Sequence, residues 1–139
     1  MKLFVPGEPA PQGSKNAYKR GTAVVMVESN KRLPEWRKRL VHALQAHLGD
    51  EPAFATAVTV DATFYLTRAK SNRKQAVTQK PDLDKLARAL GDALTISGVL
   101  KDDSYIVEWR LIKLYAEFEQ PGVEIEIKPF NANTPRNWI

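Results

Sequence analysis

Four aspartates in one stretch of the chain have the residue type and the spacing that metal-dependent chemistry requires. Asp82 and Asp84 stand two residues apart, and the adjacent pair Asp102-Asp103 follows about one helix length later. Carboxylates that are brought together without enough cations repel one another, and a bound divalent ion removes that conflict. Such an ion positions water, stabilises charge on a phosphate and assists the leaving oxygen. The pattern therefore predicts a divalent-metal site to which both pairs contribute.

The composition narrows the choice of metal. The chain holds no cysteine and two histidines, so the usual sulfur and nitrogen ligands of zinc are scarce. His42 and His47 lie five residues apart on one predicted helix, where they do not face each other, and we interpret them as surface residues. Oxygen ligands favour Mg²⁺, with Mn²⁺ as the alternative.

Each aspartate also has an ordinary structural interpretation. Aspartate is a favoured helix N-cap, and one in the first turn of a helix stabilises the helix dipole. This explains Asp82 or Asp84 alone, but two carboxylates so close cannot both cap the same amides well. Asp92 is predicted to point away from Asp84, so Asp92 and Asp102 are secondary candidates. Arg88, one turn after Asp84, could orient that carboxylate, contact phosphate, or form only a surface ion pair.

The elements around these residues must bring the two aspartate pairs together. Residues 82–96 are predicted as an amphipathic helix, and Pro81 prevents it from starting earlier. Such a helix is roughly 20 Å long, so the chain must double back for the pairs to meet. We expect residues 95–101, which include Gly98, to make that turn. The apolar stripe of this helix consists of Leu83, Leu86, Leu90 and Leu94.

The whole chain predicts an α+β domain with the element order β-(hairpin)-α-β-α-β-β. The domain covers residues 1–130, residues 131–139 form a tail, and the two helices pack on one face of a mixed sheet. Strands are expected at residues 2–5, 17–19, 22–27, 56–66, 105–118 and 123–128, and the first helix at 34–49. Residues 105–118 are apolar on both faces for much of their length, which predicts a central strand. Arg37 falls within the apolar arc of the first helix, where it could snorkel or face a partner.

Charge is distributed unevenly along the chain, whose formal net charge is +5. Basic residues dominate the first 80 positions, above all in residues 67–80, which we expect to form a mobile, exposed loop. A basic field around a small acidic spot suits a metal-dependent enzyme that acts on a polyanion. No apolar run is long enough for a transmembrane helix, and the N-terminal apolar segment is too short for a signal peptide. We therefore expect a cytoplasmic protein with no membrane partner.

The acidic stretch resembles the RusA family of Holliday junction resolvases, which is common in phages and prophages. That family has an Asp-Leu-Asp that opens a helix, an Asp-Ala-Leu later in that helix, and an Asp-Asp pair that enters the next strand. These motifs correspond here to residues 82–84, 92–94 and 102–103. The loop Pro9-Ala10-Pro11-Gln12-Gly13-Ser14-Lys15 is also similar to the family's opening loop. The resemblance covers most of the chain, from about residue 5 to residue 127.

The resemblance implies a Mg²⁺-dependent endodeoxyribonuclease that works as a homodimer and places paired nicks across a four-way DNA junction, without a small-molecule cofactor. It assigns the metal ligands, which are also catalytic, to Asp82, Asp84 and Asp103. Lys85 stands where the family usually has Asn. Arg88 stands where the family has a functional Lys, so the positive charge is kept, and the resemblance assigns Arg88 to the catalytic residues. Two symmetric cuts require two sites related by a two-fold axis. Phosphate contacts are expected from Lys15, Lys70, Arg73, Lys74, Lys80 and Lys85.

Three other interpretations compete with this one, and the first is the least consistent with the sequence. An Asp-x-Asp phosphatase or phosphotransferase needs its first aspartate at the end of a buried strand, whereas Gln79-Lys80-Pro81 precedes Asp82. A non-catalytic nucleic-acid-binding module would explain the basic surface and leave the aspartates as caps and turn residues. An inactive resolvase would be consistent with Lys85 and Arg88.

Overall fold

The computed structural model describes residues 1–13, 15–21, 23–28 and 30–136. Its elements follow the predicted order. They are β1 (Lys2–Pro6), β2 (Lys15–Arg20), β3 (Ala23–Glu28), α1 (Leu33–Leu48), β4 (Val58–Leu66), α2 (Leu83–Ile96), the 3₁₀ turn η1 (Asp103–Tyr105), β5 (Ile106–Tyr115) and β6 (Gly122–Pro129).

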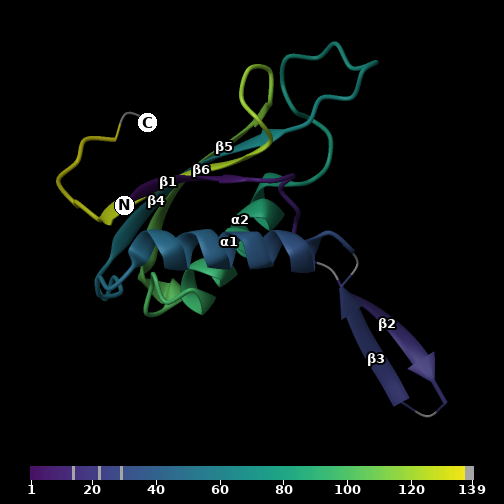
Figure 1. The fold of residues 1–139 in the computed structure, drawn as a ribbon, viewed down its shortest axis with the longest axis horizontal. Helices are drawn as coiled ribbons and strands as arrows, with labels where there is room; N and C mark the ends of the chain where they lie inside the picture. The colour runs from purple at the N-terminus through teal and green to yellow at the C-terminus, as the bar shows by residue number, and fades with distance from the viewer. Residues whose placement is uncertain (14, 22, 29, 137–139) are drawn as a thin grey trace.

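The main body is a mixed four-stranded sheet with both helices on one face, as the sequence predicts (Figure 1). The strand order is β1-β6-β4-β5. β4 and β5 run parallel, whereas β6 pairs antiparallel with both β1 and β4. Strands β2 and β3 form a separate hairpin that projects from the body (Figure 1). At its tip Gly21 has φ of +60°, a conformation that glycine adopts without steric cost.

The expectation that residues 105–118 form a central strand is wrong. Within the described part of the chain this segment is β5, whose one strand partner is β4, so it lies at an edge of the sheet. Its apolar residues do not mark burial on both faces, because Val107, Ile112 and Leu114 are 53%, 47% and 38% exposed. A run of apolar side chains cannot distinguish a strand covered by its own chain from an edge strand that keeps an apolar surface.

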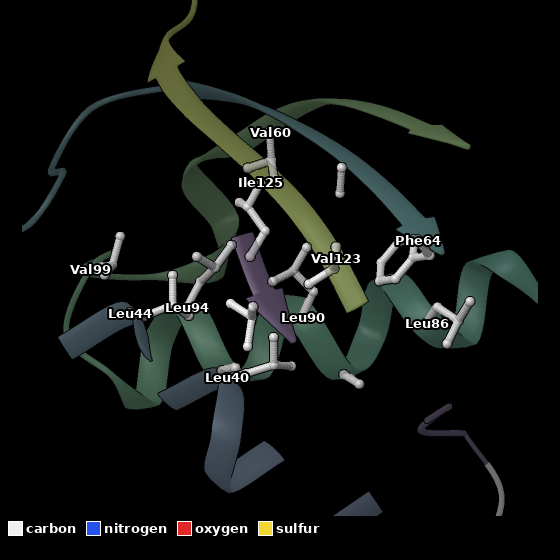
Figure 2. Close-up of a cluster of buried hydrophobic side chains, with 14 of the residues drawn as sticks. Leu40, Leu44, Val60, Phe64, Leu86, Leu90, Leu94, Val99, Val123 and Ile125 are labelled. Atoms are coloured by element: carbon white, nitrogen blue, oxygen red, sulfur yellow. The ribbon is translucent and has the colours of Figure 1, made fainter. Parts of the chain in front are cut away.

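The core lies between the sheet and the two helices (Figure 2). Alternation along β4 is confirmed, because every second residue from Val58 to Leu66 is buried. Helix α2 adds Leu86, Leu90 and Leu94, and α1 adds Trp36, Leu40 and Leu44. Burying one such side chain contributes roughly 1.5–3 kcal/mol to the free energy of unfolding. This core fixes α2 against the sheet and so fixes the polar residues that α2 carries.

The chain doubles back after α2, as the distance between the aspartate pairs requires. Gly98 has φ of +83°, and the backbone N–H of Leu100 donates to the carbonyl of Leu94 at 3.1 Å. Residue 100 also forms a parallel bridge with Phe54. The turn carries the chain to η1, which contacts α2. Within the part of the chain that the structure describes, no helix has the length and apolar character to span a bilayer.

Candidate active site

Asp82 and Asp84 lie at the start of α2 in different surroundings. Asp82 precedes the helix in an extended conformation, and its side chain accepts no capping hydrogen bond. Its Oδ2 lies 3.7 Å from Nζ of Lys85 instead. Asp84 is exposed in the first turn, where its charge complements the helix dipole. The capping interpretation therefore does not explain the side chain of Asp82.

A cavity of about 510 Å³ brings Asp84 and Asp103 together. It lies between α2, η1 and β5, so its two carboxylates come from elements at either end of the turn around Gly98. Its lining consists of Asp84, Ala87, Arg88, Gly91, Asp92, Asp103, Ile106, Trp109 and Leu111. One member of each aspartate pair therefore lines the same cavity, whereas their joint binding of a metal stays a prediction.

Asp82 lines a different hollow of about 450 Å³, together with Arg32, Lys80 and Lys85. Among the described residues, no three His, Cys, Asp or Glu side chains stand close enough to hold a metal ion by themselves. Mg²⁺ does not require such a set, because it is usually bound by one or two carboxylates, waters and substrate phosphates. The hard oxygen donors of Asp84 and Asp103, on two walls of one cavity, therefore fit a divalent ion.

Asp92 does not point away from Asp84, because both residues line this cavity. The side-chain amide of Gln12 donates from Nε2 to Oδ2 of Asp92. The amide oxygen of the same glutamine accepts from Nη2 of Arg37. Arg37, unexplained on the apolar arc of α1, is therefore held within the chain. Gln12 lies in the opening loop that the family resemblance singled out, but no specific role was predicted for it from the sequence, although a charged residue such as Arg37 at a core-facing position signals an internal partner.

Asp102 has a structural role. Its Oδ1 accepts a hydrogen bond from the backbone N–H of Ser104 at 2.8 Å, which caps the turn η1. That hydrogen bond, followed by one from the Ser104 side chain, lowers the pKa of the Asp102 carboxyl below its usual value. Asp102 thus shapes the turn that carries Asp103.

The two basic residues of α2 differ in their contacts. Arg88 is exposed at the cavity, and no ion pair joins it to Asp84 among the described residues. Lys85 is partly buried against the N-terminal loop. A Cβ at Gly13 would lie 2.9 Å from Cδ of Lys85, so only glycine fits there without displacing the lysine. Lys113, which sequence analysis missed, donates to the carbonyls of Gln79 and Pro81 and holds the entry to α2.

Residues 67–80 contain no helix or strand, as expected, but one of their arginines is an anchor. The guanidinium of Arg68 lies 4.1 Å from the ring centroid of Tyr115 and pairs with Glu117. It also donates to the carbonyl of Lys74, so the loop folds around it. The predicted phosphate-binding residues Lys70, Arg73, Lys74 and Lys80 are all exposed. The side chain of Lys15, in the hairpin, lies outside the described part of the structure.

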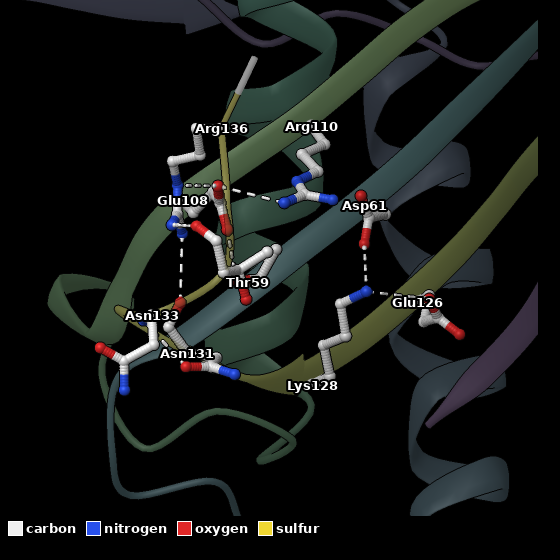
Figure 3. Close-up of polar contacts among 10 residues, drawn as sticks. Thr59, Asp61, Glu108, Arg110, Glu126, Lys128, Asn131, Asn133 and Arg136 are labelled. Carbon is white, nitrogen blue, oxygen red and sulfur yellow. Dashed lines mark hydrogen bonds and ion pairs between the residues drawn. The ribbon is translucent and has the colours of Figure 1, made fainter. Parts of the chain in front are cut away.

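The face of the sheet opposite the helices carries a polar network (Figure 3). Glu108 accepts from the Thr59 hydroxyl at 2.7 Å and from Nε of Arg136 at 3.0 Å. Lys128 of β6 pairs with Asp61 on the neighbouring strand β4 and with Glu126 on its own strand. The hydrogen bond from Thr59, followed by that from Arg136, lowers the pKa of Glu108. Arg136 thereby ties the residues after β6 back to β5.

Comparison with known proteins identifies the family. A family model described as Endodeoxyribonuclease RusA matches residues 6–128. An uncharacterized protein of Bacillus subtilis (strain 168), YqaN, is 28% identical over 144 residues, covering 95% of this chain and 98% of that protein. The Crossover junction endodeoxyribonuclease RusA of Aquifex aeolicus (strain VF5) is 26% identical over 132 residues, covering 95% of this chain and 94% of the relative. Because the match spans nearly the whole chain, the protein belongs to the RusA family of endodeoxyribonucleases.

Proposed function

We propose that this protein is a metal-dependent endonuclease that resolves four-way DNA junctions by paired symmetric nicks. The observation that carries the proposal is the cavity in which Asp84 of α2 and Asp103 of η1 meet beside Arg88. The family supplies the reaction class, and the Aquifex aeolicus relative is named as a crossover junction nuclease. The formal net charge of +5 suits a polyanionic substrate.

The proposed metal is Mg²⁺, with Mn²⁺ as a possible substitute. Asp84 and Asp103 would hold it in the cavity, and Asp82 is proposed as a third ligand. When bound, the ion would supply the Lewis acid and the activated water that phosphodiester hydrolysis needs. Asp82 would have to leave Lys85, an exposed ion pair of the kind that contributes at most about 1 kcal/mol.

Arg88 is proposed as an electrostatic contact to the phosphate at the cavity. An arginine side chain can stabilise developing negative charge but is a poor proton donor. The remaining DNA contacts are assigned to four exposed cations of residues 67–80, to the partly buried Lys85, and to Lys15, whose side chain the structure does not describe. They are Lys15, Lys70, Arg73, Lys74, Lys80 and Lys85.

We further propose that the protein works as a homodimer. Paired cuts on a two-fold symmetric junction require two active sites related by a two-fold axis. The exposed apolar side chains of β5 favour an interface along this edge, since monomeric proteins usually protect such strands. Arg37 does not support the dimer, because its partner is Gln12 of the same chain.

The test compares a synthetic four-way junction with a linear duplex of the same sequence, in Mg²⁺ and in EDTA. We expect two symmetric nicks in the junction with Mg²⁺, none in EDTA, and little cutting of the duplex. Junction binding without nicking in Mg²⁺ or Mn²⁺ would favour the non-catalytic module and contradict the enzyme.

A further inference from the structure

One glutamine connects the two helices beside the cavity. Gln12 lies in the loop between β1 and the hairpin, donates to Asp92 of α2 and accepts from Arg37 of α1. These partners are 80 and 25 residues away in the sequence. The bridge therefore joins three segments that only the folded chain brings together.

The chemistry of the three groups fixes the direction of the bridge. A guanidinium can only donate hydrogen bonds, and an ionised carboxylate can only accept them. The amide oxygen of Gln12 must therefore face Arg37, and its NH₂ group must face Asp92. Gln12→Leu would remove both hydrogen bonds. Gln12→Glu, when ionised, would pair with Arg37 but repel the carboxylate of Asp92.

The loop that carries Gln12 is held in place on both sides. The backbone N–H of Gln12 donates to the carbonyl of Lys85 at 3.0 Å, and Gly13 packs against the side chain of Lys85. Upstream, Pro9 and Ala10 are buried. The amide is therefore presented to Asp92 from a preorganised backbone.

Gln12 engages one of the two carboxylate oxygens of Asp92. Oδ2 is engaged by Gln12, whereas Oδ1 has no hydrogen-bond partner among the residues that the structure describes. Asp92 lines the cavity with Asp84 and Asp103 but is not one of the proposed ligands. A carboxylate so placed can accept hydrogen bonds from the water that a divalent ion carries.

We propose that Gln12 is a positioning residue of the active site, which orients the Asp92 carboxylate at the cavity wall and thereby strengthens divalent-ion binding. The inference deepens the proposed function and rests on it. Groups that orient the surroundings of a metal typically change its affinity by roughly 10–100-fold when they are removed.

The first test measures Mn²⁺ binding to the free protein by calorimetry. Gln12→Leu should weaken binding roughly 10–100-fold. Gln45→Leu, at an exposed glutamine of α1, is the matched control and should bind as the parent does. Because Gln12 acts through Asp92, the double variant with Asp92→Asn should be no weaker than Asp92→Asn alone.

A second measurement covers the case in which Gln12→Leu fails to fold. Gln12→Glu keeps a partner for Arg37 but sets a carboxylate against Asp92. Adding Asp92→Asn replaces that repulsion by an amide donor, so it should raise the melting temperature of Gln12→Glu but not that of the parent.

The outcomes separate the two proposals. Parental Mn²⁺ affinity in Gln12→Leu, additive effects in the double variant, or no rise in melting temperature for Gln12→Glu with Asp92→Asn would each overturn the role of Gln12 alone. A parent protein that neither binds Mn²⁺ nor nicks the junction would overturn the proposed function and this inference together.

Discussion

Asp102 and Asp103 are neighbours with identical side chains, and the structure gives them different tasks. Asp102 caps η1 through the N–H of Ser104, whereas Asp103 lines the cavity with Asp84. Asp82 and Asp84 differ in the same way, since one pairs with Lys85 and the other does not. At the residue scale, function is assigned by hydrogen-bond partners rather than by residue type.

The first prediction concerns the three proposed ligands. Asp82→Asn, Asp84→Asn and Asp103→Asn should each lower Mg²⁺-dependent nicking by orders of magnitude, because each removes a negative ligand. Junction binding should persist or tighten, because a negative charge near phosphate is lost. Nicking of labelled junctions, binding and melting temperature are measured on each variant.

Melting temperatures should hold or rise in Asp84→Asn and Asp103→Asn, because repulsion between carboxylates that line one cavity falls. Asp82→Asn loses the exposed ion pair with Lys85 and should drop only slightly. If the aspartates were only caps, each change would instead cost about 0.5–2 kcal/mol of stability and leave catalysis intact. Nicking at the parental rate by all three variants would rule out this site.

The second prediction concerns Glu108, whose pKa is lowered mainly by the Thr59 hydroxyl. A carboxylate with a lowered folded-state pKa stabilises the fold above the ordinary glutamate value of roughly 4.3. This contribution is lost as the pH falls through the lowered pKa. Glu108→Gln should therefore flatten the fall in melting temperature below roughly pH 4.3. Glu51→Gln, at an exposed carboxylate, serves as the control, and curves of equal slope would contradict the prediction.

At the scale of elements, the loop of residues 67–80 contains one arginine that is packed against the body and several basic residues that are exposed. Arg68 holds the loop to Tyr115 and Glu117, while Arg73 and Lys74 are exposed at its surface. A charge substitution can therefore test DNA contact without unfolding the loop, provided that Arg68 is left unchanged.

The third prediction is that Arg73→Gln with Lys74→Gln weakens junction binding and reduces its salt slope by about one unit per lost phosphate contact. Fluorescence anisotropy over a range of salt concentrations measures both quantities. Lys38→Gln, at an exposed lysine of α1, should leave them unchanged. An unchanged slope in the loop variant would remove this loop from the DNA interface.

At the scale of the whole molecule, the edge position of β5 bears on the oligomeric state. The fourth prediction is that light scattering at micromolar concentration reports about twice the chain mass of 15.6 kDa. Ile112→Lys should yield monomers, because it places a charge on the exposed apolar edge. Ile96→Lys, at the end of α2, removes a similarly exposed isoleucine and should remain dimeric. A parent monomer that still resolves junctions would contradict the homodimer.

Local sequence patterns were enough to predict the helices and strands. The surroundings of individual site residues depend on contacts between distant segments, which these patterns do not contain. The alternation in β4 and the stripe of α2 report burial directly, so both were predicted correctly. The expectation for Asp92 was wrong because, at roughly 100° per residue, Asp92 lies only about 80° from Asp84 around α2, so both line the same cavity. Gln12 was missed because its partners are distant in sequence. Whether Asp82 joins Asp84 and Asp103 at a metal stays a prediction.

The position of β6 has a consequence for the order in which the chain is made. β6 is made after β1 and β4, yet it pairs with both of them inside the sheet. Until residue 129 has emerged, β1 lacks the one strand partner that it has among the described residues, and β4 has one open edge. Nascent chains therefore expose strand edges that favour aggregation, and the sheet can close only after β6 has left the ribosome.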